Sequence, residues 1–584
     1  MKLLLCALNA KYIHSNLAVY SLMAYAKKAP MDIQLAEYTI NNRTEEILKE
    51  IYREKPDIVA FSCYIWNIDQ IYELTAELHK VAPHISIWLG GPEVSYDAKK
   101  VLNKHPEISL VMVGEGEETF YELIRQWDNS KKELENIKGI AYREHEQIKE
   151  NPPRGQLDMD KLPFVYEDLT KFKNKIIYYE TSRGCPFSCS YCLSSIDKRV
   201  RFRSFSLVRQ ELQFFLEHKV KQVKFVDRTF NCNHKHARQI WEYITEHDNG
   251  VTNFHFEIAA DLLREEDINL FKKMRPGLIQ LEIGVQSTHQ QTIQEIRRTM
   301  DLEKLKELVA RVKKNGNIHQ HLDLIAGLPY EDYETFTKSF DEVFAMEPDQ
   351  LQLGFLKVLK GSYIHEKKHD YKIVYGNRSP YEVLRTKWMT YDDILKLKEV
   401  EEMVELYYNS AQYTKTLPYL LKFAQRPFDF FEDLAEFYYG NYQIGVKHSR
   451  LSYYEILRAF ALERYKEVKE RVLNELLVYD LYLRENVKKR PEWTDTIPLE
   501  KKEATRFYRM EDTKEYFPEM KPYDSKIAAG NAHVEKFFID VDSYKEKEWW
   551  ALFNYHARNP LTYEADVKEV KGILDGTGKS FRDL

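Results

Sequence analysis

The chain has 584 residues, which at about 100 to 200 residues per domain implies three or four domains and excludes a single small module. Hydrophobic residues make up 43% of the chain and charged residues 30%, a composition that supplies packed cores and excludes an intrinsically disordered protein. Lys and Arg total 86 against 92 Asp and Glu, a net charge of −6. No overall positive field would therefore attract nucleic acid or anionic lipid.

The first 135 residues alternate short apolar runs with longer amphipathic stretches. The apolar start, Met1–Asn9, is shorter than the core of a signal peptide, and we expect it to form a buried strand. The predicted strands are Lys2–Leu8, Ile33–Tyr38, Ile58–Ser62, Ile85–Leu89 and Leu110–Val113. Strands and helices that alternate at this spacing predict a doubly wound parallel sheet, a Rossmann-like domain over residues 1–135.

Residues 136–175 are predicted to be a linker that holds a hairpin, Lys138–Arg143 with Gln147–Glu150, and then the breaker sequence Asn151–Gly155. A second alternating series fills residues 176–369. Its predicted strands are Ile176–Thr181, Gln222–Asp227, Phe254–Ala259, Ile279–Val285, His319–Ile325 and Leu351–Leu356. Six such units fit a partial (β/α)6 TIM barrel, since a complete barrel needs more length.

Residues 370–584 are predicted to form a mainly α-helical domain. Long Leu-, Tyr- and Phe-rich stretches such as Tyr391–Tyr408 and Tyr453–Tyr482 predict helices, and Lys536–Val541 predicts at least one strand. No apolar run in the whole chain approaches the roughly 20 residues that cross a bilayer. We expect a soluble, cytoplasmic protein with no membrane partner.

Three of the six cysteines lie within eight positions, as Cys185, Cys189 and Cys192 in a C-x3-C-x2-C pattern. This usage indicates a metal site in a reducing compartment. A [4Fe–4S] cluster normally takes four cysteines, so three leave one iron open to a non-protein ligand. The alternative is a zinc site that uses Cys192 and a distant His, although zinc prefers paired C-x2-C arms.

The cysteine triplet, Tyr191 before its last member and its place after the first strand of a (β/α)6 series resemble the radical S-adenosylmethionine (SAM) superfamily. The resemblance implies that Cys185, Cys189 and Cys192 hold a [4Fe–4S] cluster. It also implies that SAM chelates the open iron, is cleaved to a 5′-deoxyadenosyl radical and packs beside Tyr191.

Polar residues at successive strand ends of the barrel resemble the SAM-binding positions of this superfamily: Asp227, Glu257, Gln286 and the Gly327 turn. Each taken alone could instead be a helix cap or part of a buried salt bridge. Arg201 and Arg203 could contact SAM or a reducing partner, or form a solvated basic strand. Cys232, His234 and His236 look like metal ligands, but they open a helix that Asn231 or Asn233 can cap.

A Rossmann-like domain directly before such a barrel resembles the cobalamin-binding class of the superfamily. The matching residues end three predicted strands: Ser62, Gly90, Gly91, Pro92, Gly114 and Gly116. Small residues there admit a large flat ligand to the sheet edge. The D-x-H-x-x-G signature, whose His ligates cobalt in other B12 proteins, is absent, and we expect His14 to be a loop or core residue. The alternative is a Rossmann domain that has lost its corrinoid.

The resemblance implies a cobalamin-dependent radical SAM enzyme that methylates an unactivated carbon through a 5′-deoxyadenosyl radical and methylcobalamin. Cyclisation or rearrangement without methyl transfer is an alternative. A methylthiotransferase acting on tRNA or protein would carry three further cysteines in the N-terminal domain, where only Cys6 and Cys63 occur. A cobalamin sensor or chaperone is the non-enzymatic alternative. The sequence does not identify the substrate, and we assign no catalytic residue. We expect a reducing partner such as flavodoxin or ferredoxin.

Overall fold

A computed structural model of the chain describes residues 1–29, 31–127, 133–145, 147–442, 446–487 and 489–571. The chain forms two compact units. The first consists of Met1–Phe336 with Gly354–Tyr391, and the second of Thr337–Leu353 with Asp392–Leu584.

The N-terminal part of the first unit is built on a seven-stranded sheet with the order β2-β1-β3-β4-β5-β6-β7. Strands β1 to β5 run parallel. Their bounds are β1 Lys2–Asn9, β2 Asp32–Thr39, β3 Ile58–Ser62, β4 Ser86–Gly90 and β5 Leu110–Met112. The strand order reverses between β1 and β3, so their carboxyl ends open a crevice of the kind in which ligands bind. The predicted doubly wound sheet is confirmed.

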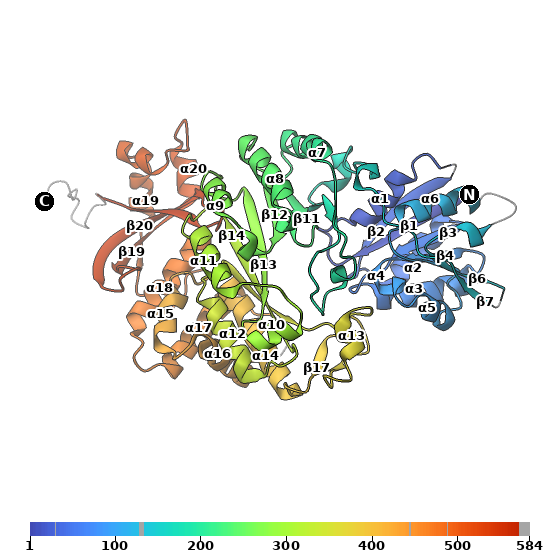
Figure 1. Ribbon diagram of the computed structural model, residues 1–584. Helices are drawn as coiled ribbons and strands as arrows, with labels where there is room; N and C mark the ends of the chain where they lie inside the picture. Colours follow the sequence, from blue (N-terminus) through green and yellow to red (C-terminus); the bar gives the residue numbers. More distant parts are fainter. Residues whose placement is uncertain (30, 128–132, 146, 443–445, 488, 572–584) are drawn as a thin grey trace. The chain divides into compact units, whose positions relative to one another are not determined.

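Helices cover both faces of this sheet. Because the strands are buried on both sides, their sequences are continuous apolar runs. Helices α1 (Leu17–Tyr25) and α6 (Glu117–Trp127) lie on one face, and α2 (Thr44–Glu54), α3 (Ile68–Val81) and α5 (Ala98–Lys104) lie on the other (Figure 1). Each helix turns an apolar stripe to the sheet; on α3 the buried residues recur at helical spacing as Ile68, Ile71, Leu74 and Leu78.

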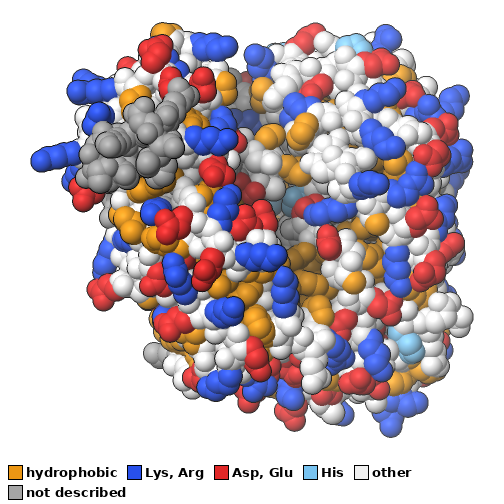
Figure 2. Space-filling view, turned by 90° about the vertical axis from the view of Figure 1, so that its left-hand side faces the viewer, with side chains coloured by type: hydrophobic (Ala, Val, Ile, Leu, Met, Phe, Trp, Pro, Cys, Tyr) orange, Lys and Arg blue, Asp and Glu red, His pale blue; other side chains and the backbone are white. Residues whose placement is uncertain are grey.

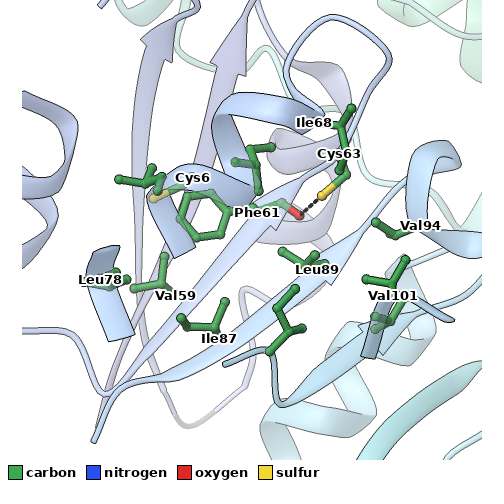
Figure 3. Close-up of a cluster of buried hydrophobic side chains, with 14 of the residues drawn as sticks. Cys6, Val59, Phe61, Cys63, Ile68, Leu78, Ile87, Leu89, Val94 and Val101 are labelled. Atoms are coloured by element: carbon green, nitrogen blue, oxygen red, sulfur yellow. Dashed lines mark hydrogen bonds between the residues drawn. The ribbon is translucent and has the colours of Figure 1, made fainter. Parts of the chain in front are cut away.

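Cys6 and Cys63 belong to the core between this sheet and helices α2 to α5. Their neighbours in Figure 3 include Val59, Phe61 and Leu89 from the strands. Both thiols are wholly buried, and burial raises the pKa of each well above its ordinary value. The Cys63 thiol donates to the carbonyl of Phe61 over 3.7 Å. The two cysteines are therefore packing residues.

The predicted hairpin extends the first sheet. Strands β6 (Ile140–Glu144) and β7 (Gln147–Glu150) pair antiparallel, and β6 pairs antiparallel with β5. Tyr142 lies opposite Leu110, and its side chain is buried in the core that α1 and α6 cover. The hairpin thus shares a core with the N-terminal sheet, although the sequence alone places it in a linker.

The second sheet has the order β15-β14-β13-β12-β11-β8 and forms a partial barrel, as predicted. Parallel pairing joins its strands from β8 to β14. The bounds are β8 Ile177–Tyr179, β11 Gln222–Phe225, β12 Asn253–Ile258, β13 Ile279–Gln286, β14 His319–Ala326 and β15 Gln350–Phe355. Helices that alternate with them are α7 Phe205–Glu217, α8 His234–Glu246, α9 Glu265–Phe271, α10 Gln290–Glu295, α11 Leu302–Lys313 and α12 Tyr333–Phe344.

The second unit combines helices with a four-stranded antiparallel sheet of order β18-β19-β20-β21. Its longer helices are α14 Tyr391–Val404, α16 Pro427–Asn441, α17 Arg450–Arg464 and α18 Glu470–Arg484, and its strands are β18 Ile497–Pro498, β19 Ala532–Ile539, β20 Glu546–Arg558 and β21 Ala565–Glu569. The single helix predicted over Tyr453–Tyr482 is divided at Tyr465, which leaves the helical conformation and packs its ring on Phe430 and Phe460.

Among the described residues, no helix combines the length and the apolar character that a membrane span requires. On the face that Figure 2 draws, Lys and Arg side chains are interspersed with Asp and Glu side chains. This mixture agrees with the near balance of 86 basic against 92 acidic residues in the whole chain.

Candidate functional site

The three clustered cysteines lie on a loop, residues 184–200, that a short antiparallel pair closes. Strand β9 (Ser182–Arg183) pairs with β10 (Arg201–Phe202), so that Arg183 lies opposite Arg201. At the start of the loop, the Cys185 amide donates to the carbonyl of Asp197 over 3.0 Å. Gly184 has a φ of +94°, and a Cβ there would lie 2.7 Å from the carbonyl oxygen of Arg199. The loop therefore closes tightly only with glycine at this position.

The three cysteine side chains of this loop are buried or half-buried. Cys185 and Cys189 are each 8% exposed, and Cys192 is half-buried. Burial raises the pKa of Cys185, and the charges of Cys192 and Cys189 add to the effect. No three His, Cys, Asp or Glu side chains among the described residues could hold one metal ion together. A [4Fe–4S] cluster does not require this, because each thiolate binds a different iron of the cluster. The three thiols therefore need not converge on one point.

Arg298 and Gln286 lie beside the cysteine loop. The Arg298 guanidinium approaches the Cys189 sulfur at 3.8 Å and the Tyr191 hydroxyl at 3.4 Å, and it also donates to the carbonyl of Gly284. Gln286 adopts a φ of +74° beside a β-bulge at the end of β13, and its Oε1 is buried without a hydrogen-bond partner. A strained residue with a free buried acceptor is typical of a ligand site. This orphaned oxygen and the three thiols fit a site for SAM on a cluster.

Asp227 and Glu257 have different surroundings: Asp227 follows β11, whereas Glu257 lies near the end of β12. The buried Asp227 carboxylate accepts from the Thr181 amide at 3.0 Å and from the Thr181 and Ser182 hydroxyls at 2.6 Å each. Its oxygens thus hold the segment that leads into the cysteine loop. For Glu257, burial is the largest effect and raises the pKa of its carboxyl to about 7. The positive charge of Arg228 opposes this rise. The SAM contacts of both residues stay predictions.

Gly327 follows β14 with a φ of +85°. A Cβ on Gly327 would lie 2.8 Å from Cγ1 of Val383. The structure thus gives a packing reason for glycine here, and the predicted contact of this turn with SAM stays a prediction.

The inside of the barrel carries charged side chains that our reading of the sequence missed. Lys224 on β11 donates to Glu282 on β13 over 2.9 Å, and His255 on β12 lies 2.9 Å from the same Glu282 oxygen. On β14, His321 and Asp323 lie 3.0 Å apart. Burial alone would raise the pKa of Glu282, but His255 and Lys224 lower it to about 2. These side chains could have been predicted from the polar residues at alternating positions of the strands. A barrel with a solid core would carry apolar residues at those positions.

The predicted corrinoid residues lie together at the carboxyl ends of β3, β4 and β5. The Ser62 hydroxyl accepts from the Asn16 amide over 3.1 Å. The carbonyl of Gly90 accepts from the Cys63 amide over 2.7 Å. Pro92 opens the short helix α4 (Pro92–Ser95), and the carbonyl of Gly116 accepts from the Phe120 amide at the start of α6. The structure thus brings these residues to one edge of the sheet.

Two glycines at this edge have unlike surroundings. Gly91 has a φ of +116°, and a Cβ there would lie 2.5 Å from the carbonyl oxygen of Cys63. Gly114 has a φ of +81°, and a Cβ there would meet nothing within 4 Å. Gly91 is therefore needed by the fold, whereas Gly114 presents bare backbone to open space. Such a cradle fits the edge of a large flat ligand.

Exposed aromatic rings follow β1, β3 and β4, and none of them was selected from the sequence. Tyr12, Trp66 and Tyr96 are 69%, 42% and 43% exposed. Tyr64 and Trp66 stack with ring centroids 4.4 Å apart. His14 contacts the second sheet: its Nδ1 lies 2.7 Å from the hydroxyl of Tyr178 on β8. The expectation that His14 is a loop or core residue agrees with this contact.

Arg201 and Arg203 form ion pairs. Arg201 binds Glu115 and Asp197, whereas Arg203 is buried against Glu211 and the carbonyl of Met159. The alternative of a solvated strand is wrong for both, because the two side chains are largely buried against carboxylates. A contact with SAM or with a reducing partner stays a prediction. Asn233 caps α8 by accepting from the His236 amide over 3.2 Å, as expected.

Three families match successive parts of the chain. Residues 4–124 match the B12 binding domain, and residues 179–343 match the radical SAM superfamily. Residues 369–553 match a family described as a protein of unknown function, DUF4080.

Similar proteins carry related combinations of domains. The chain is 26% identical to "Uncharacterized methyltransferase PH0819" of Pyrococcus horikoshii, over 67% of this chain and 83% of that protein. It is 26% identical to the "Anaerobic magnesium-protoporphyrin IX monomethyl ester cyclase" of Synechocystis, over 54% and 64%. It is 24% identical to the "Cobalamin-dependent radical SAM methyltransferase TokK" of Streptomyces tokunonensis, over 48% and 44%. The chain thus spans less than two thirds of the last two relatives.

The fold resembles a solved structure of the "Cobalamin-dependent S-adenosylmethionine radical enzyme OxsB" with aqua-cobalamin bound. The TM-score is 0.58 at 14% identity, and the match covers 82% of this chain and 80% of that one. The B12-binding domain, the radical SAM domain and the cysteine triplet on its first loop occur in one order on one chain. The chain therefore combines a B12-binding domain with a radical SAM domain, as in cobalamin-binding radical SAM enzymes, and these domains imply a [4Fe–4S] cluster, SAM and cobalamin as cofactors.

Proposed function

We propose that the protein is a cobalamin-dependent radical SAM methyltransferase that acts on an unactivated carbon. The observation that carries the proposal is the loop that brings Cys185, Cys189 and Cys192 to the mouth of a partial barrel, beside the free Gln286 oxygen. When bound, the cluster supplies an electron for cleavage of the SAM sulfonium, and the corrinoid supplies the methyl group.

In this proposal the chain's own residues position SAM in the following way. Cys185, Cys189 and Cys192 would hold the cluster as thiolates and would leave one iron for the methionine end of SAM. Gln286 Oε1, buried and without a partner, accepts from a SAM hydroxyl or ammonium group. Tyr191 packs beside SAM, while Asp227 holds Thr181 and Ser182 in place behind the loop. Glu257 and the Gly327 turn complete the proposed SAM site.

The corrinoid would lie at the carboxyl edge of the first sheet, against Ser62, Gly90, Gly91, Pro92, Gly114 and Gly116. The open space in front of Gly114 supports this position. Among the described residues, no histidine stands in the D-x-H-x-x-G context that supplies a lower cobalt ligand elsewhere. We propose that the chain would hold the corrinoid without a histidine from such a motif.

Ring closure without methyl transfer is the second candidate, because a relative matched over 54% of the chain is named as a cyclase. The methylthiotransferase alternative lacks thiols for a further cluster, since Cys6 and Cys63 are core residues. We also propose a cytoplasmic location and a low-potential donor such as flavodoxin or ferredoxin. The low potential that reductive SAM cleavage requires supports such a donor.

The test is anaerobic reconstitution of the full chain with iron, sulfide and hydroxocobalamin, followed by mass spectrometry of SAM products after reduction with dithionite. We expect about four irons and one corrinoid per chain, with S-adenosylhomocysteine formed alongside 5′-deoxyadenosine. Formation of 5′-deoxyadenosine alone would favour the cyclase candidate. If Cys189→Ala leaves iron content and SAM cleavage unchanged, both candidates are wrong. The matched control is Cys232→Ala, because Cys232 lies outside the triplet.

A further inference from the structure

Two carboxylates flank Gly116: Glu115 lies in the loop between β5 and α6, and Glu117 is the first residue of α6. Each binds an arginine at one end of the cysteine loop. Glu117 meets Arg183, which directly precedes Gly184 and Cys185. Glu115 meets Arg201, the first residue after the loop. We name these four residues the carboxylate–arginine bridge. It joins the proposed corrinoid edge to both ends of the proposed cluster site.

The geometry of the bridge is bidentate at both ends. Arg183 donates through Nη2 to Glu117 over 2.6 Å and through Nη1 to the other Glu117 oxygen over 3.3 Å. Arg201 binds both Glu115 oxygens, one of them over 3.1 Å. The Glu115 oxygen at 3.1 Å also accepts from the Leu157 amide over 2.9 Å. Paired hydrogen bonds of this type fix the planes of both groups, so a shift of either loop disturbs the other.

The bridge is largely shielded from water. The Glu117 side chain is 6% exposed and that of Arg183 17%, while Arg201 is 12% and Glu115 23% exposed. Surface ion pairs contribute little, but a buried carboxylate such as Glu117 is left uncompensated if its arginine moves away. The arginines have second partners, Glu180 for Arg183 and Asp197 for Arg201. Burial alone would raise the pKa of Glu117, yet the Arg183 charge lowers it, so the carboxylate stays ionised. The bridge is thus a rigid link between the two loops.

We infer that the carboxylate–arginine bridge couples the two cofactor sites, so that the cluster strengthens corrinoid binding and the corrinoid stabilises the cluster. An assembled cluster fixes the cysteine loop and both arginines at its ends. The arginines in turn hold Glu115 and Glu117 and thereby Gly114 and Gly116 in the shape that binds the corrinoid. The inference rests on the proposed function, because it takes both cofactor positions from it. Thermodynamic linkage requires both effects to have the same factor.

The experiment measures hydroxocobalamin affinity of the full chain by absorbance titration under anaerobic conditions, once with the reconstituted cluster and once after its removal by a chelator. The coupling factor is the ratio of the two dissociation constants. We expect a factor of about 5 to 50 for the natural sequence, within the range of allosteric couplings. For Arg201→Gln we expect a factor within about twofold of 1, and Arg201→Lys should keep the charge but lose most of the coupling.

A matched control is Arg154→Gln. Arg154 is 11% exposed and binds Glu122 and Thr119 on the same helix α6, away from the cysteine loop. This variant should keep the full coupling factor. Iron retention against the chelator, with and without corrinoid, gives the reciprocal measurement without any turnover. If Arg201→Gln does not fold, the nearly isosteric Glu115→Gln tests the same pair.

Two results would overturn the inference: a coupling factor of 1 in the natural sequence, or an unchanged factor in Arg201→Gln and Glu115→Gln. Equal loss of coupling in Arg154→Gln would also contradict it, because the effect would then not belong to the bridge. Failure of the natural chain to bind any corrinoid is a different outcome. It would refute the proposed function, and with it the premise of the coupling.

Discussion

Alanine at Gly91 and at Gly114 should separate folding from corrinoid binding. Gly91 follows β4 and Gly114 follows β5 at the same sheet edge, and both have positive φ, +116° and +81°. A left-handed backbone costs a residue other than glycine roughly 1–2 kcal/mol. At Gly91 the new methyl group would also lie 2.5 Å from a backbone oxygen, and such overpacking adds about 1–3 kcal/mol. We therefore expect Gly91→Ala to destabilise the N-terminal sheet by about 2–5 kcal/mol.

Gly114→Ala lacks the second cost, because nothing lies within 4 Å of its Cβ. We expect a loss of only about 1–2 kcal/mol in stability but at least tenfold weaker binding of hydroxocobalamin, since the methyl group enters the space proposed for the corrinoid. Urea unfolding without cofactor measures the first effect and absorbance titration the second. Unchanged corrinoid affinity in Gly114→Ala, or equal destabilisation by both substitutions, would refute the reasoning.

Three further changes test other parts of the molecule. Arg298→Gln should lower the cluster reduction potential by on the order of 50–100 mV, because it removes a positive charge 3.8 Å from the Cys189 sulfur; an EPR-monitored redox titration would show an unchanged potential if the contact is irrelevant. Burial raises the pKa of Glu257 from 4.5 to about 7, so its contribution to stability is present below pH 4.5 and lost as pH rises through 7. Glu257→Gln should flatten that decline in thermal scans from pH 5 to 8, and an unaltered pH profile would contradict the assignment. Asp480→Ala should destabilise the second unit by about 2–4 kcal/mol, since two backbone amides lose their acceptor, whereas the exposed Glu463→Ala should have no effect on urea unfolding.

The strands and the cysteine loop could be predicted because their signals are local. Apolar runs such as Lys2–Leu8 and Ile58–Ser62 reappear as β1 and β3 with nearly the same bounds. Parallel strands buried on both faces must be apolar throughout, so composition alone marks them. The cysteine spacing is equally local, because one short loop supplies every thiol.

The ion pairs and strained positions could not be predicted, because they depend on partners far along the chain. Arg183 and Glu117 are 66 positions apart, and Arg201 and Glu115 are 86 apart. No local pattern says which of many carboxylates an arginine will meet. The φ of +74° at Gln286 likewise follows from a bulge between two strands. In the second unit, β20 was missed because its ends are charged and its burial does not alternate: four consecutive residues in its middle are buried.

The burial of Cys6 and Cys63 makes them natural reporters of breathing in the N-terminal sheet. A thiol reagent reacts with the thiolate, and both side chains are 0% exposed with raised pKa values. Alkylation of either cysteine must therefore wait for a transient opening of the core, and its rate reports the free energy of that opening. Peptide mass spectrometry can follow the labelling of each sulfur separately. The labelling rates with and without corrinoid would show how much ligand binding raises the free energy of opening of the sheet.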